Sequence, residues 1–439
     1  MSKPKKNRRR FIKESAAGLL LALAGPGIGR TGGEENTRTV RLGFVGVGSR
    51  GTVLLRLALM MDGVEIPAIC DINEEHLGRA QRLVERRGYP KPEGYSRGPE
   101  DYRRLVERDD LDAVVVATPK EWHTPMMVAT MEAGKYGGTE VPAAVSVEEC
   151  WQLVETSERT GSPCMMLENY CYFREVLMVQ NMVSRGLFGE LLHFEVGYQK
   201  DERNVRVGPQ GELRGWSKFR AEHNGNLYPT HAVGPAAWLG NVNRGDRFDY
   251  LVSVSTKSVS LNRFLAARFG EDHPGAKIKF ANGDVNTSII RTANGLTITL
   301  YYDTQCPRPW DWIFRAQGTG GIFMRNMEKI YIEGMSPEAR DWEGTDRYYR
   351  EFEHPLWQIH GDKPINLARG VCEYLVLDQF IQAVRRRSAP PMDVYDAAAW
   401  SVITPLSEQS VADRSAAVDF PDFTRGKWEK KRELNFYVV

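Results

Sequence analysis

The stretch VRLGFVGVGSRG, residues 40–51, joins an apolar run to a Gly46-x-Gly48-x-x-Gly51 pattern. The stretch SRGTVLLRLALMM, residues 49–61, continues from it with helical character. A strand, a glycine turn and a helix in this order are typical of a doubly wound parallel sheet. Such glycines let backbone N–H groups and the helix N-terminus approach a pyrophosphate. The stretch therefore predicts a dinucleotide-binding turn at the start of an α/β domain.

An acidic residue, Asp71, closes the next expected strand, EIPAICD (residues 65–71). There it would accept hydrogen bonds from ribose hydroxyls, and its charge would repel a 2′-phosphate, which favours NAD over NADP. A helix is expected near residues 74–87, and LDAVVVATP (111–119) has the continuous apolar character of a strand buried on both faces. Alternating strands and helices thus predict an α/β Rossmann domain with a doubly wound parallel sheet over residues 38–160.

Beyond residue 160 the pattern changes to alternating apolar and polar residues, which predicts half-buried antiparallel strands. Asn294-Gly295 between two such runs is a strong hairpin signal. Segments 370–387 and 396–415 have helical periodicity instead. We therefore expect residues 161–439 to form a substrate-binding α+β domain with a large, mainly antiparallel open sheet, onto which C-terminal helices pack back. The alternating runs are ELLHFEVGYQ (190–199), FDYLVSVSTKSVS (248–260) and VNTSIIRTANGLTITLYYDT (285–304).

Length and composition are typical of a globular protein with two domains. A chain of 439 residues exceeds one ordinary core, and a formal net charge of +1 gives no attraction to nucleic acid or to an anionic membrane surface. The six cysteines are scattered without C-x-x-C pairs or a zinc-like rhythm with histidine, so neither a disulfide framework nor a metal site is expected. The exposed face of a large open sheet would allow two copies to pair as a homo-oligomer.

The N-terminal stretch NRRRFIKESAAGLLLALAGPGIG, residues 7–29, resembles a twin-arginine export signal. Three arginines precede a short, weakly hydrophobic run rich in alanine and glycine. A membrane anchor is the alternative, but this run is much shorter than the roughly 20 apolar residues that span a bilayer. We expect residues 1–37 to be signal and linker, the twin-arginine export machinery to be a partner, and the mature protein to be periplasmic or extracellular.

Ligands of parallel α/β sheets bind beyond the carboxyl ends of the strands. The strand expected within residues 111–119 is followed by Lys120, Glu121, Trp122 and His123. These four residues are candidates for the nicotinamide side of the site. Trp122 could equally be a packing residue, and His123 a polar residue at the start of the following helix.

The chain resembles the large family of NAD-dependent sugar oxidoreductases that pair a Rossmann domain with an open-sheet domain. Those dehydrogenases usually carry Glu-Lys-Pro after the fourth strand, and the lysine takes part in proton transfer. This chain has Glu140-Val141-Pro142, which counts against simple dehydrogenase chemistry. From about residue 40 to residue 415 the chain resembles glycoside hydrolase family 109, typified by α-N-acetylgalactosaminidases. The motifs that carry this resemblance include EWHTPMMVATMEAGK (121–135), EVPAAVSVEECWQLVE (140–155), CMMLENY (164–170) and NGNLYPTHAVGP (224–235).

The resemblance implies a role for each residue that matches a family motif. His231 would be the principal acid and base, assisted by Tyr228 and Tyr198, with both tyrosines also at the substrate. From position alone, His231 could be a helix-start residue and Tyr198 a half-buried sheet residue. The cofactor contacts implied, together with the glycines of the turn, are Gly46, Gly48, Ser49, Arg50, Gly51, Asp71, Lys120, Glu121, Trp122, His123, Glu140, Val141, Asn169, Tyr228 and His231.

The chain departs from the family on the substrate side. It has Trp216-Ser217 where the family has Trp-Arg, so Arg214 or Arg220 is expected to replace that arginine. Trp310 stands where the family tends to have tyrosine, and LARGVCEYL (367–375) replaces a Gly-His-Gly-Gly stretch. Arg214 and Trp310 are therefore candidate substrate contacts beside the two tyrosines.

The reaction implied by the resemblance is hydrolysis of an N-acetylgalactosaminide or a related small glycoside without net redox change. A hydride moves from sugar C3 to NAD, the C2 proton leaves, the aglycone is eliminated, water adds and the hydride returns. Two alternatives remain open. One is an exported sugar oxidoreductase or transhydrogenase with tightly bound NAD, and the other is a catalytically inactive carbohydrate-binding homologue.

Overall fold

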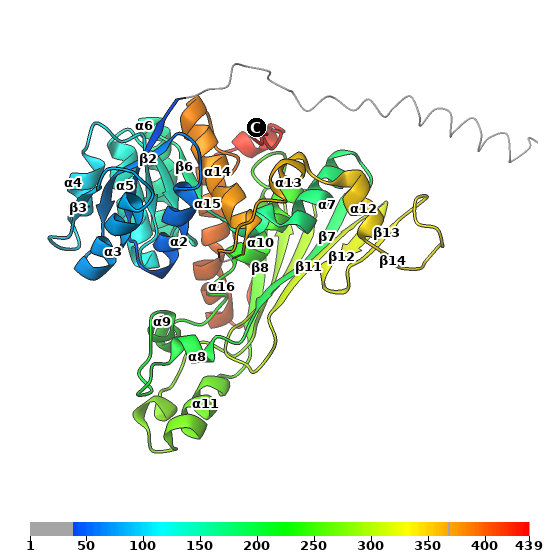
Figure 1. The fold of residues 1–439 in the computed structure, drawn as a ribbon. Coiled ribbons are helices and arrows are strands. Elements are labelled where there is room, and N and C mark those ends of the chain that lie inside the picture. The colour runs from blue at the N-terminus through cyan, green and yellow to red at the C-terminus, as the bar shows by residue number, and fades with distance from the viewer. Residues whose placement is uncertain (1–37, 368, 439) are drawn as a thin grey trace, which may run out of the picture. The chain divides into compact units, whose positions relative to one another are not determined.

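The computed structural model describes residues 38–367 and 369–438; the expected export signal and linker lie outside this range. Residues 40–166 build a sheet of six parallel strands in the order β3-β2-β1-β4-β5-β6 (Figure 1). This is the strand order of a doubly wound dinucleotide-binding domain, so the expected parallel sheet is confirmed. Its strands are β1 (Val40–Val45), β2 (Val64–Cys70), β3 (Glu93–Tyr95), β4 (Ala113–Val116), β5 (Tyr136–Thr139) and β6 (Cys164–Met166).

Two of the helices between these strands begin at side chains that cap them. Asn73 accepts hydrogen bonds from the backbone N–H groups of Glu75 and His76, and Ser146 accepts one from Glu149. The helix after β1 differs, because it follows Gly48 and no side chain caps it. Its first N–H groups can therefore bind an anion. The helices of this domain are α2 (Ser49–Ala58), α3 (Glu74–Glu85), α4 (Tyr102–Val106), α5 (His123–Glu132) and α6 (Val147–Thr160).

The parallel sheet continues past residue 160, the boundary expected from the sequence. Its last strand, β6, pairs with β5 through Cys164 and Gly137. Three buried residues are too few to form a recognisable strand pattern, so this strand is visible only through its pairing.

A second sheet has nine strands in the order β14-β13-β12-β11-β7-β10-β9-β8-β15. All neighbouring pairs are antiparallel except β7 and β10, which confirms a large, mainly antiparallel sheet. The expected hairpin joins β9 to β10, and Gly295 in its turn has a φ of +96°. The strands are β7 (Leu191–Gln199), β8 (Phe248–Ser255), β9 (Asn286–Thr292), β10 (Thr297–Asp303), β11 (Asp311–Gly318), β12 (Gly321–Met324), β13 (Lys329–Ile332), β14 (Glu343–Gly344) and β15 (Val418–Asp419).

The C-terminal helices pack back onto the body, as the sequence predicts. Helix α14 (Val371–Arg386) lies against α2 and β1 of the first domain, while α16 (Ile403–Ala412) lies against β8 (Figure 1). A Cβ on Gly138 would lie 3.1 Å from the ring of Phe380 in α14, so glycine lets this helix approach β5 closely. The remaining helices are α7 (Arg174–Ser184), α8 (Arg203–Arg206), α9 (Trp216–Glu222), α10 (Thr230–Leu239), α11 (Ser260–Phe269), α12 (Asp346–Phe352), α13 (Pro355–His360) and α15 (Val394–Ser401).

Membrane-spanning helices, disulfide bonds and metal-binding clusters are absent from the described part of the chain. No helix within residues 38–367 and 369–438 has the length and apolar character needed to cross a membrane. All six cysteines fall in this part of the chain and are free thiols. The same residues contain no group of three or more histidine, cysteine, aspartate or glutamate side chains that could hold a metal ion.

Candidate active site

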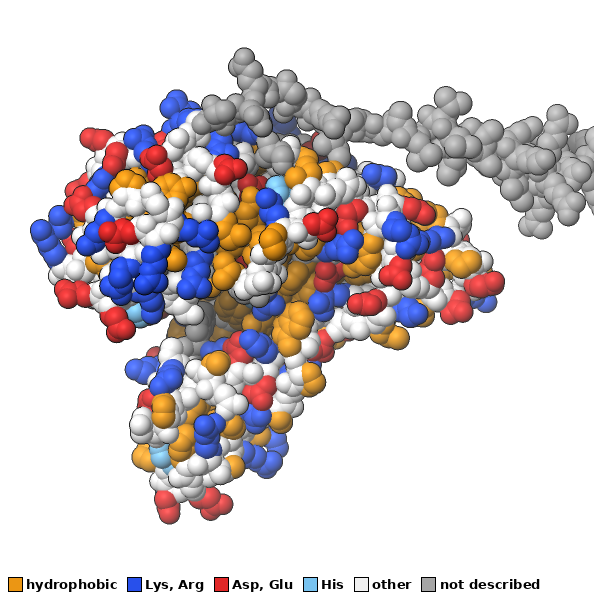
Figure 2. All heavy atoms as spheres, viewed as in Figure 1, with side chains coloured by type: hydrophobic (Ala, Val, Ile, Leu, Met, Phe, Trp, Pro, Cys, Tyr) orange, Lys and Arg blue, Asp and Glu red, His pale blue; other side chains and the backbone are white. Residues whose placement is uncertain are grey.

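A cavity of about 660 Å³ opens where the carboxyl ends of β4, β5 and β6 face the end of β7. The space-filling view shows a deep hollow between the first domain and the second sheet, with hydrophobic side chains in its depth (Figure 2). Loops of both domains line the cavity, which is where ligands of such sheets are expected. Its lining residues are Arg50, Ala117, Thr118, Pro119, Lys120, His123, Glu140, Val141, Asn169, Lys200, Tyr228, His231, Trp310, Arg369 and Glu373.

The glycine turn beside this cavity has the geometry of a phosphate-binding loop. Gly46 has a φ of +82°, and a Cβ on Gly51 would lie 1.9 Å from the carbonyl oxygen of Gly46, so both positions require glycine. A Cβ on Gly48 would meet nothing closer than His76, at 3.7 Å. The turn is thus tight at Gly46 and Gly51 and open at Gly48, where a pyrophosphate can approach.

Asp71 directly follows β2, at the position that the sequence predicts for ribose binding. Its carboxylate accepts hydrogen bonds from the backbone N–H of Val47 at 2.8 Å and of Asn73 at 2.9 Å. These bonds hold the carboxylate beside the glycine turn and leave each oxygen a further lone pair for a ribose hydroxyl.

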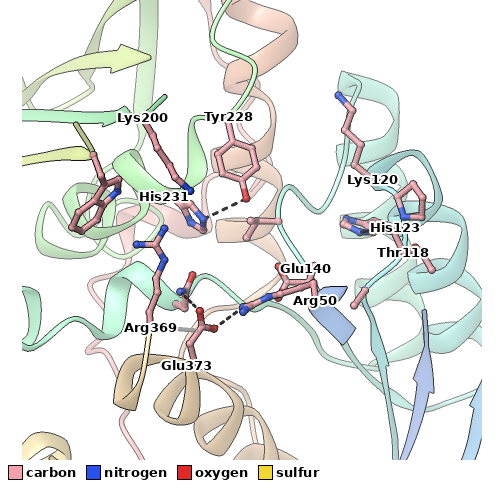
Figure 3. Close-up of a pocket in the computed structure, with 15 residues that line it drawn as sticks. Arg50, Thr118, Lys120, His123, Glu140, Lys200, Tyr228, His231, Arg369 and Glu373 are labelled. Carbon is pink, nitrogen blue, oxygen red and sulfur yellow. Dashed lines mark hydrogen bonds and ion pairs between the residues drawn. The ribbon is translucent and has the colours of Figure 1, made fainter. Parts of the chain in front are cut away.

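Arg50 links the two domains through two carboxylates. Its guanidinium lies 2.7 Å from Glu140 of the Glu-Val-Pro stretch and 2.7 Å from Glu373 of α14. Burial lowers the pKa of Arg50, but the charges of the two carboxylates outweigh this effect, so the net pKa lies above its ordinary value. Asn169 donates a hydrogen bond of 2.9 Å to the other oxygen of Glu373. The cluster fixes the position of Glu140 in the cavity wall (Figure 3).

Three hydrogen-bonded side chains reach the cavity, and the middle one is His231 in the first turn of α10. The His231 Nδ1 atom lies 2.6 Å from the carboxylate of Glu168, which is fully buried. The hydroxyl of Tyr228 lies 3.3 Å from Nε2 of the same ring (Figure 3). Because a carboxylate can only accept, Nδ1 carries the proton of that bond, which leaves Nε2 to accept a proton. This is the arrangement of a general base held by a buried acid.

Aromatic packing holds the imidazole in place. The ring of Tyr170 stacks on His231 with 4.0 Å between ring centroids and 12° between ring planes. Tyr198 lies 5.4 Å from His231 and 5.2 Å from Tyr228, measured between centroids, and donates a hydrogen bond of 3.2 Å to Glu202. Burial raises the pKa of Tyr198, so its hydroxyl stays protonated near neutral pH. Tyr198 supports the two other rings from outside the cavity lining.

Two residues after β4 lie at the opposite wall. His123 is buried, with Nδ1 2.7 Å from the carbonyl oxygen of Pro142 and Nε2 2.9 Å from that of Thr118. Burial lowers the pKa of Lys120 to about 7, against the raising effect of Glu121. Its ammonium nitrogen lies 3.0 Å from the centroid of the Phe219 ring. His123 therefore anchors the Glu-Val-Pro stretch to the loop after β4, while Lys120 faces the cavity (Figure 3).

Besides Tyr198, Asp71 and the glycine turn with Ser49, four more residues singled out in the sequence lie outside the cavity lining. Glu121 is exposed, and Trp122 packs against the main core. Arg214 is half exposed and donates hydrogen bonds to Glu212. Arg220 is fully buried and donates to Asn282, Tyr302 and Thr304.

The structure adds four charged cavity or support residues that the sequence did not indicate: Glu168, Lys200, Arg369 and Glu373. Glu168 precedes Asn169 within a motif already recognised, so its place in that motif was the available signal. Lys200 directly follows β7, Arg369 shortly precedes α14, and Glu373 lies in the first turn of α14. Only the fold brings these three residues to this cavity.

Comparison with known families extends over most of the chain. Residues 172–430 match the family described as Glycosyl hydrolase 109, C-terminal domain. The chain belongs to glycoside hydrolase family 109. Residues 40–168 match the oxidoreductase family with an NAD-binding Rossmann fold. The expected family and the expected cofactor, NAD, are thereby confirmed.

Relatives from two bacteria carry the same family name. A glycosyl hydrolase family 109 protein of Stenotrophomonas maltophilia (strain K279a) is 40% identical, over 97% of this chain and 97% of the relative. Another, from Shewanella sp. (strain W3-18-1), is 44% identical over 90% of this chain and 87% of the relative.

Solved structures of dehydrogenases share the fold of this family 109 chain. Levoglucosan dehydrogenase in complex with NADH and levoglucosan is 21% identical, with a TM-score of 0.65 over 88% of this chain and 100% of that chain. An inositol dehydrogenase homologue complexed with NAD+ from Azotobacter vinelandii is 17% identical, with a TM-score of 0.66 over 89% and 100%. At these identities the likeness establishes the fold alone.

The residues of this family 109 chain fit NAD. The N-terminus of α2 has no side-chain cap, and the space at Gly48 is open for a phosphate. The buried Oδ1 atom of Asn169, a cavity-lining residue, has no hydrogen-bond partner among the described residues. An amide-bearing ligand such as a nicotinamide would satisfy this acceptor.

Proposed function

We propose that this chain hydrolyses N-acetylgalactosaminides or closely related glycosides by transient oxidation, elimination and water addition, with NAD restored in each turnover. The observation that carries the proposal is the buried Glu168–His231–Tyr228 chain, which reaches the cavity beside the dinucleotide-binding turn. It supplies one strong acid–base group beside a redox cofactor site. Paired carboxylates are the usual requirement of glycosidases, but NAD-dependent glycosidases are a known exception.

The glycine turn, Asp71 and Asn169 would hold NAD, which when bound would supply reversible hydride acceptance from sugar C3. His231 takes the proton of the C3 hydroxyl through Nε2, so that C3 becomes a carbonyl. The carbonyl acidifies the hydrogen on C2. Glu168 stabilises the imidazolium that forms on proton uptake, because its carboxylate is buried 2.6 Å from Nδ1.

Elimination and water addition then exchange the aglycone for a hydroxyl group. A base removes the C2 proton, the C1–O bond breaks, and the aglycone oxygen receives a proton. Water adds across the new C1–C2 double bond, with hydroxyl at C1 and hydrogen at C2. His231 first passes the proton of the C3 hydroxyl to solvent, which leaves Nε2 ready to take the C2 proton. Because an imidazole can both accept and return protons, we assign these transfers to it as well.

Tyr228 acts as a hydrogen-bond donor in this scheme. Burial raises the pKa of Tyr228 well above its ordinary value, and the neighbouring Tyr198 and Glu140 add to the rise. A tyrosine that keeps its proton at neutral pH can stabilise a developing negative charge on a sugar oxygen. It is a poor base, which leaves proton acceptance to His231.

The proposal includes export through the twin-arginine machinery, supported by the sequence of residues 7–29. A compartment outside the cytoplasm has no ready pool of NAD. A dehydrogenase that released NADH in each turnover would stall there, whereas an enzyme that restores its bound NAD would continue.

Incubating the purified protein with p-nitrophenyl N-acetyl-α-galactosaminide, without added NAD, tests the proposal. We expect release of nitrophenol over many turnovers, because the bound NAD is not consumed. A keto-sugar product with its glycosidic bond intact would identify a sugar oxidoreductase instead. Sugar binding without any product, across a panel of glycosides, would identify a carbohydrate-binding protein.

A further inference from the structure

We propose that the preferred substrate sugar carries a negatively charged group, a carboxylate or a sulfate ester, which Arg369 and Lys200 hold at the His231 side of the cavity. The proposal rests on the proposed function for its catalytic arm and names the substrate class of the same site. Both cations line the cavity, and both lie near His231 in the close-up, opposite Thr118 and His123 (Figure 3).

Arg369 presents a guanidinium that no carboxylate neutralises within the described part of the chain. Its carbon Cζ lies 4.4 Å from the ring centroid of Tyr170 and 5.3 Å from that of Trp310. Two aromatic faces thus orient the guanidinium, and neither accepts its N–H groups as an oxygen anion would. An arginine held in this way is prepared for an oxyanion such as a carboxylate or a sulfate, to which it can donate two hydrogen bonds.

Lys200 adds a second positive charge at the end of β7. Its ammonium lies 3.8 Å from Glu202, at the outer limit of an ion pair. Glu202 already forms a closer ion pair with Arg206 and accepts a hydrogen bond from Tyr198. The charge of Lys200 is therefore only weakly compensated, and its ammonium can reach an anion in the cavity.

The two carboxylates in the cavity lining are not paired with these cations. Glu140 and Glu373 both pair with Arg50, in a cluster of one positive and two negative charges. Lys200 and Arg369 supply positive charge outside this cluster, on the His231 side of the cavity. These positive charges would attract and orient an anionic sugar, but they would give a neutral sugar no such attraction.

The cofactor does not account for Arg369 and Lys200. The phosphates of a dinucleotide belong at the glycine turn and the N-terminus of α2, which are parts of the first domain. Arg369 and Lys200 come from the second domain and adjoin Trp310, which offers a flat surface for a sugar ring. The anion that they match therefore belongs to the substrate.

The experiment compares matched pairs of p-nitrophenyl α-glycosides with the NAD-loaded protein. One pair is the N-acetylgalactosaminide and its 6-sulfate, and the other is the galactoside and the galacturonide. We expect kcat/KM to favour the anionic member of at least one pair, and the pair concerned tells sulfate from carboxylate. Arg369→Gln should lower the anionic-to-neutral ratio of kcat/KM by about 10- to 100-fold, the effect of losing one charged hydrogen-bonded pair.

Arg325→Gln is the matched control. Its guanidinium carbon lies 5.0 Å from the same Trp310 ring, but Arg325 is paired with Glu175 and does not line the cavity. This variant should keep the wild-type ratio. The inference would be overturned if the neutral and anionic members of both pairs had equal kcat/KM and if Arg369→Gln left the anionic-to-neutral ratio unchanged. That result would leave the proposed hydrolysis intact.

A binding measurement separates this inference from the proposed function. Isothermal titration of the NAD-loaded protein compares galacturonate with galactose, and N-acetylgalactosamine 6-sulfate with N-acetylgalactosamine. Tighter binding of an anionic sugar that is lost in Arg369→Gln supports the anionic site even if no glycoside is cleaved. Equal binding within both pairs, or a preference that survives Arg369→Gln, would contradict it.

Discussion

Replacing His231 by alanine is expected to lower kcat by about 10²- to 10⁴-fold, the usual contribution of a general acid–base group. Among the described residues, His231 is the only histidine that lines the cavity and also has a buried carboxylate bonded to its Nδ1 atom. Nitrophenol release and the affinity for NAD should be measured on the same preparation. We expect the cofactor to remain bound, because the glycine turn and Asp71 are untouched.

His193→Ala is the control for this variant. His193 lies near the start of β7, where its ring bonds to Thr297, and it does not line the cavity. It should retain wild-type activity. A His231→Ala protein that folds, binds NAD and still turns over at the wild-type rate would remove His231 from the mechanism.

Glu168→Gln is expected to lower kcat by about 10- to 100-fold, since it removes a charge hydrogen-bonded to the reacting imidazole. Both His231 and the backbone N–H of Tyr170 bond to the same oxygen, Oε1. A glutamine can keep these two bonds, while its amide nitrogen occupies the site of Oε2, which has no partner in the described structure. The substitution therefore removes mainly the negative charge.

The distinguishing result for Glu168→Gln is a fall in kcat with KM, NAD affinity and Tm near those of the wild type. A purely structural role would instead lower Tm and weaken NAD binding. Glu175→Gln, seven positions further along and paired with Arg325 outside the cavity lining, should change none of these quantities. Unchanged kcat in Glu168→Gln would show that the carboxylate does not support proton transfer.

Most of the fold could be predicted from local sequence. The strand, glycine turn and helix of residues 40–58 predicted the parallel sheet, and Asn294-Gly295 predicted the hairpin of β9 and β10. These signals are local because a turn or a cap depends on a few neighbouring residues. Strand β6 was missed, since three buried residues carry no periodicity and its place depends on pairing with β5.

The candidate site was only partly predictable. Motifs placed His231, Tyr228, Glu140 and Asn169 at one site, and all four line the cavity. Arg369 could not be placed in this way, because it enters from a segment that departs from the family pattern.

The substrate-side predictions had different outcomes. Trp310 lines the cavity, and Arg369 stands over its ring. Arg214 forms an ion pair with Glu212, two residues away, and does not line the cavity. A nearby carboxylate thus binds this side chain locally. Whether either residue contacts the sugar stays a prediction. Arg369, which lines the cavity beside Trp310, was not among the expected replacements for the missing arginine.

Loss of label from C2 tests the central claim, cleavage by elimination, most directly. The measurement uses a glycoside carrying deuterium at C2, cleaved in ordinary water, with mass spectrometry of the released sugar. If the bond breaks by elimination, His231 removes the deuteron and exchanges it with solvent before water adds, so the released sugar should carry hydrogen at C2. A released sugar that retains its deuterium at C2 would show direct hydrolysis and contradict the account.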